Sequence, residues 1–166
     1  MLNTNHADLV AVSVAGAIAH PGFPGLPAEP YRLAASGKPF LLPTYGGIVY
    51  KKTALAFNYL MQYLGEDMMN RCMAAYFEAW KFKHPSPADI EAVFEATSGK
   101  NMDWFFQELI PSTLHVDYAV KGLRKTDSGY SVKVCNRGDI ASPFSIEVSR
   151  NGNEKSLAWN DGIEPG

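Results

Sequence analysis

The chain has 166 residues, of which 46% are hydrophobic and 19% are charged, and its formal net charge is −2 at pH 7. This length suits one ordinary domain or two very small ones, and the composition is that of a globular chain and not of a disordered one. The near-zero charge gives no electrostatic reason to expect a nucleic-acid partner.

The first predicted segment is an apolar run from Leu9 to Ala19 with no Lys or Arg before it, so a secretory leader is not expected. Because a bilayer requires about 20 apolar residues, we expect no membrane span and predict a buried helix or strand instead. The next stretch, residues 20–43, carries six prolines and three glycines. Residues 1–44 are therefore predicted to form an extended Pro/Gly-rich connector with one short apolar segment. The compartment cannot be inferred.

Apolar side chains at helical spacing predict four helices in residues 45–112. The first runs from about Val49 to Leu64, and its expected inner face is Ala54, Phe57, Leu60, Met61 and Leu64. The second follows Glu66 and Asp67, whose charges suit a helix start. Its expected inner face is Met69, Cys72, Met73, Tyr76, Phe77 and Trp80.

Start and stop signals define the third and fourth helices. Ser86 is the expected N-cap of the third, with Pro87 at its first position, and Gly99 is its expected end. Asn101 can cap the fourth helix, which Pro111 ends. The apolar residues of this last helix are Met102, Phe105, Phe106 and Leu109.

From Leu114 onward the apolar period changes from 3.6 to 2, which predicts three strands and a fourth around Lys155 to Trp159. Turn signals lie between them, at residues 126–129, 136–139 and 151–152. The expected fold class is therefore α+β, with a bundle-like segment of about four helices followed by a small, incomplete antiparallel sheet. Residues 113–166 are expected to be a truncated β-sandwich-like domain, because a usual sandwich has about seven strands.

Several clusters of side chains that could bind a metal or a ligand are better explained by core packing or by solvent exposure. Met68, Met69, Met73 and Cys72 have helical spacing, so core packing is favoured over a soft-metal site. Core packing is also favoured over a ligand platform for the aromatic residues Trp80, Phe82, Trp104, Phe105 and Phe106. The adjacent Lys51 and Lys52 are expected to form a solvated helix face. Cys72 and Cys135 do not have the spacing of a metal site.

The middle of the chain resembles the gluzincin zinc aminopeptidases, the family of aminopeptidase N and leukotriene hydrolase. Residues 45–55 are similar to the tyrosine-x-lysine segment of that family, and the likeness continues through residues 64–66, 76–82, 86–89 and 98–106. It is loose over the last 50 or so residues and weak over the first 40. The resemblance implies that residues 45–112 are the helical end of a metallopeptidase-like catalytic domain.

The resemblance also implies a role for Tyr50, which matches the family's oxyanion-stabilising tyrosine. A phenol donates from a rigid ring and stays protonated at neutral pH, so it can stabilise charge that exists mainly in the transition state. Lys51 and Thr53 depart from the family pattern, where glutamate and glycine are frequent, which bears on substrate positioning. Tyr45 is the second candidate donor. The null alternative is a tyrosine that only packs at a helix start.

No zinc site is expected in this chain. Gluzincins need a His-Glu-x-x-His pattern and a downstream glutamate, whereas the four histidines, His6, His20, His84 and His115, stand far apart. The resemblance implies that the zinc ligands lie upstream of Met1 in a parent enzyme that removes N-terminal residues from peptide substrates. The chain is then a fragment that is inactive without the missing N-terminal catalytic half, and it is expected to self-associate through exposed apolar surface. The alternatives are a non-enzymatic peptide- or protein-interaction module and a degenerate family member without zinc.

Overall fold

The structure is a computed structural model that describes residues 10–15, 17–18, 50–127, 129–150 and 154–166. Its architecture is α+β, as the sequence predicted, with helices and strands in two separate units. The helices lie in residues 50–115, and the other unit joins strand β1 to residues 116–166. The predicted connector falls almost entirely outside the described residues, apart from its apolar segment.

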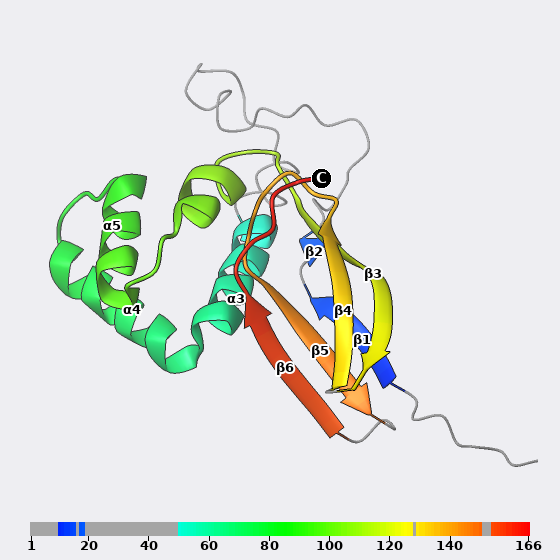
Figure 1. Ribbon diagram of the computed structural model, residues 1–166. Coiled ribbons are helices and arrows are strands. Elements are labelled where there is room, and N and C mark those ends of the chain that lie inside the picture. Colours follow the sequence, from blue (N-terminus) through cyan, green and yellow to red (C-terminus); the bar gives the residue numbers. More distant parts are fainter. Residues whose placement is uncertain (1–9, 16, 19–49, 128, 151–153) are drawn as a thin grey trace, which may run out of the picture. The chain divides into compact units, whose positions relative to one another are not determined.

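Four helices form in the predicted order, and Figure 1 shows them between the cyan and yellow-green parts of the chain. They are α3 (Thr53–Leu64), α4 (Glu66–Trp80), α5 (Pro87–Ser98) and the π-helix η2 (Trp104–Leu109). A π-helical turn at residues 50–52 leads into α3. Both π-helical stretches belong to a rare conformation that often marks a functional site.

The predicted inner face of α3 is partly wrong. Ala56, Tyr59 and Leu60 are buried, whereas the predicted Ala54 and Met61 are exposed. The α3 sequence is apolar on nearly every side, so periodicity alone does not select one face. The buried stripe begins one turn earlier than α3, at Lys52. Lys52 lies four residues before Ala56 and eight before Leu60, so all three share one helix face.

The inner face of α4 is narrower than predicted. Met69 and Cys72 are buried, which confirms core packing for this part of the methionine cluster, but Met73 is 44% exposed and Phe77 is 61% exposed. The second half of α4 therefore presents large apolar side chains to solvent. Neither cysteine of the chain forms a disulfide.

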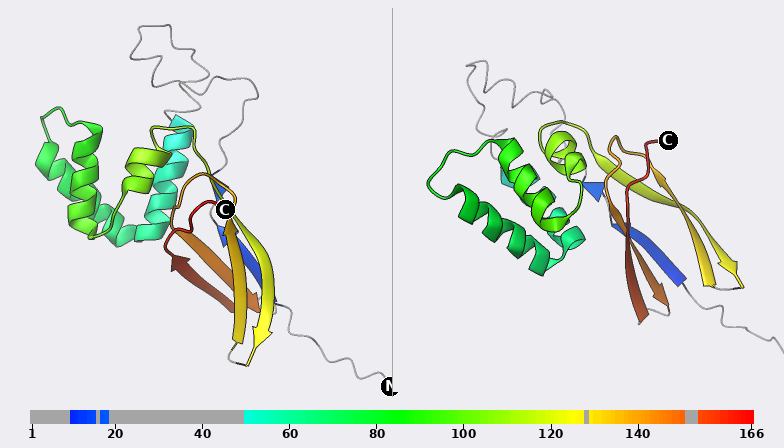
Figure 2. Two further views of the ribbon diagram at one scale, coloured as in Figure 1. Left: turned by 45° about the horizontal axis from the view of Figure 1, so that its top comes forward. Right: turned by 60° about the vertical axis from the view of Figure 1, so that its left-hand side comes forward.

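The predicted signals of α5 are confirmed. Ser86 and Asp89 form a reciprocal capping box, with Pro87 in the first turn, and Gly99 ends the helix in the left-handed conformation with φ 69°. The two hydrogen bonds from Ser86 lower the pKa of the Asp89 carboxyl. These local interactions fix where α5 begins and ends, and α5 then packs on α4 (Figure 2).

An aromatic core joins η2 to the other helices. The Phe105 ring meets the Phe57 ring edge to face at 5.2 Å, and the Phe106 ring meets that of Phe94 at 5.6 Å. Phe94, Met102, Phe105 and Leu109 are completely buried, and Trp104 is 8% exposed. Burial confirms that Trp104 and Phe105 are core residues, but Phe82 is fully exposed and does not belong to this core.

The four predicted strands are also present: β3 (Val116–Thr126), β4 (Gly129–Asn136), β5 (Phe144–Arg150) and β6 (Glu154–Asn160). They form two antiparallel hairpins, which belong to different three-stranded sheets (Figure 1). The Tyr118 ring of β3 stacks on the Phe144 ring of β5 at 4.4 Å. This stack lies in the core of the β unit with Val116 and Ile140.

The apolar segment near the N-terminus completes both sheets. Strand β1 (Val10–Ala15) pairs antiparallel with β5, and the two-residue β2 (Ala17–Ile18) pairs with β3, so the orders are β1-β5-β6 and β2-β3-β4. The predicted buried helix or strand is therefore a strand, and its place in the C-terminal sheets was not predicted. Pairing partners more than 100 residues apart leave no local signal in the sequence.

Candidate functional site

Tyr50, the predicted oxyanion donor, lies in the π-helical turn that precedes α3. Tyr50 is 64% exposed, so its phenol is at the surface of the helical unit and not sealed in the core. The second candidate donor, Tyr45, lies outside the described residues.

The prediction that Lys51 and Lys52 form a solvated face is wrong for Lys52. Lys51 is exposed, but Lys52 is only 5% exposed, and its Nζ donates a hydrogen bond to the main-chain oxygen of Ser112. Burial lowers the pKa of the Lys52 ammonium. The sequence signal for this was the spacing from Lys52 to Ala56 and Leu60, which places the lysine on the inner stripe of α3.

The described residues of the helical unit do not provide the metal site of a gluzincin. Such a site requires two histidines one helical turn apart, and neither His84 nor His115 stands in that arrangement with another histidine. The zinc that the resemblance implies is therefore not held by these residues.

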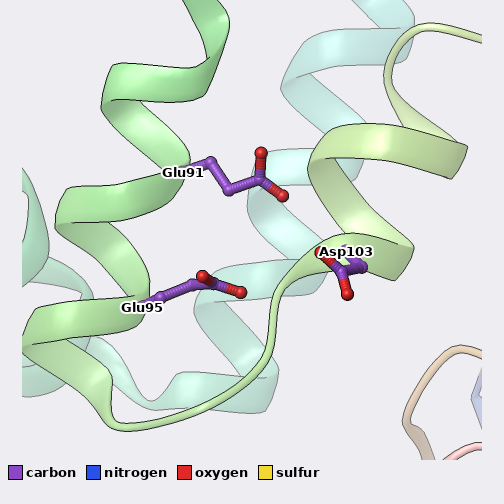
Figure 3. A group of neighbouring side chains, drawn as sticks. All are labelled: Glu91, Glu95 and Asp103. Atoms are coloured by element: carbon purple, nitrogen blue, oxygen red, sulfur yellow. The ribbon is translucent and has the colours of Figure 1, made fainter.

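A group of three carboxylates, missed in the sequence analysis, does come together. Glu91 and Glu95 lie one turn apart on α5, and Asp103 lies just before η2; one oxygen from each is within 4.8 Å of the others (Figure 3). Carboxylate oxygens are ligands for hard cations such as Ca²⁺. The i, i+4 spacing of the two glutamates was visible in the sequence, but the approach of Asp103 depends on how η2 packs against α5.

Hydrogen bonds within the protein account for the position of each carboxylate in this group. The Gln107 side chain donates to Glu91 at 3.0 Å and to Asp103 at 2.8 Å. The backbone N–H of Met102 donates to Glu95 at 2.8 Å, which satisfies an N–H that the helix leaves unpaired. The three carboxylates thus connect α5 to η2, and these hydrogen bonds account for their close approach without a bound cation.

A basic and aromatic loop follows α4. Phe82 is fully exposed and has a φ of 62°, a left-handed conformation that bulky residues rarely adopt. The ammonium of Lys81 lies 6.0 Å from the Phe77 ring, and that of Lys83 lies 5.6 Å from the Trp80 ring. Lys81 also pairs with Glu78 at 2.6 Å, so the positive charge of the loop is partly compensated.

Comparison with known proteins adds no relative: no protein-family model, no curated protein and no solved structure matches the chain. Among the described residues, no helix has the length and apolar content needed to cross a membrane.

Proposed function

We propose that the helical unit is the end of a gluzincin-type aminopeptidase catalytic domain and that it contributes Tyr50 as the donor to the oxyanion. The parent enzyme hydrolyses the first peptide bond of peptide substrates. When water attacks the scissile carbonyl, negative charge develops on its oxygen, and the Tyr50 hydroxyl donates a hydrogen bond to it. The zinc ligands and the groups that bind the substrate amino terminus belong to polypeptide outside these 166 residues.

The exposure of Tyr50 is the observation that supports this role. A tyrosine that served only to pack at a helix start would bury its ring, as Tyr59 does nine residues later, at 8% exposure. Tyr50 instead keeps 64% of its surface accessible to a substrate or to another domain. The segments that carry the resemblance also lie at the starts and ends of the helices from α3 to η2.

The experiment uses the polypeptide that the complete native reading frame encodes, with zinc and an aminoacyl chromogenic amide as substrate. We expect turnover by that polypeptide and none by the 166-residue chain. Tyr50→Phe should lower kcat about 100-fold or more with little change in KM, as for loss of one oxyanion donor. The half-exposed Tyr130 of β4 provides the control, because Tyr130→Phe should leave both constants unchanged.

Two results would reject the proposal. One is a complete reading frame without a His-Glu-x-x-His pattern, and the other is an unchanged kcat in Tyr50→Phe. Robust hydrolysis by the 166-residue chain alone would instead reject the claim that its catalytic machinery is incomplete.

A non-enzymatic interaction module is the second candidate. Exposed large apolar side chains favour it: Phe82 is fully exposed, Phe77 is 61% exposed and Leu55 is 54% exposed. In the first proposal these side chains are covered by the rest of the enzyme. Analytical ultracentrifugation and the peptidase assay of the complete native polypeptide distinguish the two candidate functions. An interaction module should bind a partner or itself and show no peptidase activity.

A further inference from the structure

Lys52 is a buried cation two residues after the proposed oxyanion donor. Lysine is among the residues least often buried completely, because removing its charge from water is costly unless the ammonium has partners. Lys52 is 5% exposed, and its Nζ hydrogen-bonds to the main-chain oxygen of Ser112, sixty residues along the chain. A side chain in this position is held at both ends, by its own helix and by the segment after η2.

The acceptor end of this contact is itself fixed. The Ser112 hydroxyl donates to the main-chain oxygen of Glu108 and accepts a hydrogen bond from the backbone N–H of Leu114 at 3.0 Å. Leu109, at the end of η2, is completely buried. Ser112 is therefore tied to the last turn of a core helix, so its carbonyl is a rigid anchor.

Helical geometry connects this anchor to Tyr50. A π-helical turn is wider than an α-helical one, so each residue rotates by somewhat less than the about 100° of an α-helix, and side chains two positions apart still point to opposite sides. The exposures agree, since Tyr50 is 64% exposed and Lys52 is 5% exposed. A contact that fixes the inner side of the turn therefore fixes the direction of the phenol on its outer side.

We propose that Lys52 is the positioning residue for Tyr50: its ammonium, bonded to the Ser112 carbonyl, holds the π-helical turn at residues 50–52 and thereby aims the phenol. The conformational part of this inference depends only on this chain, and the catalytic consequence rests on the proposed function. Lysine suits the task because its long stem fills the inner stripe of α3 while its head reaches a carbonyl just beyond a helix end.

The conformational part is tested by NMR on the 166-residue chain, isotope-labelled at all backbone amides and at its tyrosine rings. In the wild-type protein, the amides of residues 54–57, whose helical acceptors are the carbonyls of residues 50–53, should exchange as slowly as those in the middle of α3; exchange at the rate of a frayed helix end would overturn the proposal without any variant. Lys52→Met keeps the stem but leaves the Ser112 carbonyl without its donor. It should speed exchange of these amides about 10-fold or more and shift the Tyr50 ring resonances.

Lys51→Met is the matched control, because Lys51 is exposed and one position away. It should change neither the exchange nor the Tyr50 resonances. Lys52→Arg keeps a cationic donor and should restore most of the wild-type behaviour. Unchanged Tyr50 resonances in Lys52→Met, or equal changes in both methionine variants, would overturn the proposal.

The catalytic part is tested in the complete native polypeptide. Lys52→Met should lower kcat about 10-fold or more at nearly constant KM, whereas Lys125→Met, at an exposed position of β3, should not. Because Lys52 acts through Tyr50, the double variant Tyr50→Phe with Lys52→Met should be no slower than Tyr50→Phe alone. Additive losses would contradict a positioning role. If the complete polypeptide shows no peptidase activity, the proposed function fails, while the NMR result still decides whether Lys52 holds Tyr50.

Discussion

The hydroxyl of Tyr118 donates a hydrogen bond to the main-chain carbonyl of Ser142, 2.7 Å away. The same oxygen accepts a hydrogen bond from the backbone N–H of Ile163 at 3.3 Å. Asn136 adds two parallel contacts, from its side-chain amide to the carbonyls of Ile140 and Ile163, both at 2.8 Å. Two polar side chains of the β3–β4 hairpin thus hold the loop before β5 and the C-terminal segment against the β unit.

Removing the Tyr118 hydroxyl should weaken the β unit measurably. Tyr118 is 5% exposed, so Tyr118→Phe keeps the stack on Phe144 but leaves the Ile163 N–H and the Ser142 carbonyl without this partner. We expect the free energy of unfolding to fall by about 1–2 kcal/mol. Urea denaturation measures it, and Tyr130→Phe on an exposed strand position should lie within about 0.5 kcal/mol of the wild type. Equal losses in the two variants would contradict the assigned role.

The same residue should give the protein a specific alkaline sensitivity. Burial raises the pKa of Tyr118 above its ordinary value of 10.0. The folded state therefore holds the phenolic proton more tightly than the unfolded state does, so this contribution to stability is complete at neutral pH and is lost as pH rises from about 10 through the raised pKa. Between about pH 8 and pH 11, the wild-type protein should lose more stability than Tyr118→Phe. Parallel curves for the two proteins would show that Tyr118 is not the responsible group.

Gly162 is expected to tolerate no side chain. A Cβ atom built on it would lie 2.0 Å from the main-chain oxygen of Ala141, and a backbone atom cannot move aside as a flexible side chain can. Gly162→Ala should therefore cost about 1–3 kcal/mol by overpacking. Gly122→Ala is the control, since a Cβ there meets nothing within 4 Å. Thermal unfolding compares the two, and equal melting temperatures would refute the close approach.

Signals that act within a few residues predicted the fold well. The capping box of Ser86 and Asp89, the left-handed Gly99 and the change of period near Leu114 each report local backbone geometry, and each agrees with the structure. The pairing of β1 with β5 was not predictable in the same way. It joins segments more than 100 residues apart, and the period of β1 does not identify its partner.

The candidate site was predictable only in part. The sequence singled out Tyr50 by resemblance, but it gave the wrong environment for Lys52, because a charged residue next to another lysine is usually solvated. Tertiary contact with Ser112 decides the burial of Lys52, and packing of η2 on α5 decides the approach of Asp103 to Glu91. Both depend on contacts with a distant segment, so the i, i+4 spacings of Lys52 with Ala56 and of Glu91 with Glu95 do not identify the partner.

The cap of α5 should be worth a measurable share of the stability of the helical unit. Ser86→Ala removes the hydroxyl that bonds to Asp89 at 2.6 Å and leaves the helix start without its side-chain cap, so we expect a loss of about 1 kcal/mol. Ser86→Thr retains a hydroxyl and should lose much less. Chemical denaturation followed by the far-ultraviolet helix signal makes the comparison. If alanine and threonine are equally harmful, the hydroxyl is not the stabilising group.

Replacing Phe82 with glycine is expected to stabilise the protein, although a large apolar side chain is lost. Its side chain is fully exposed, so truncation removes no packing, while its φ of 62° places a Cβ in the left-handed region at a cost of about 1–2 kcal/mol. Glycine adopts this conformation without strain but loses about 0.5–1 kcal/mol of chain entropy. Phe82→Gly should therefore raise the free energy of unfolding by about 0.5–1 kcal/mol.

Two further substitutions separate strain from packing at Phe82. Phe82→Ala keeps the Cβ, so it should leave the stability nearly unchanged, and the difference between alanine and glycine measures the strain. Phe94→Ala, at a completely buried position, should instead cost about 3–5 kcal/mol. If Phe82→Gly and Phe82→Ala both destabilise the isolated protein, the Phe82 side chain makes contacts in solution. Its exposure would then no longer support a surface that other polypeptide covers.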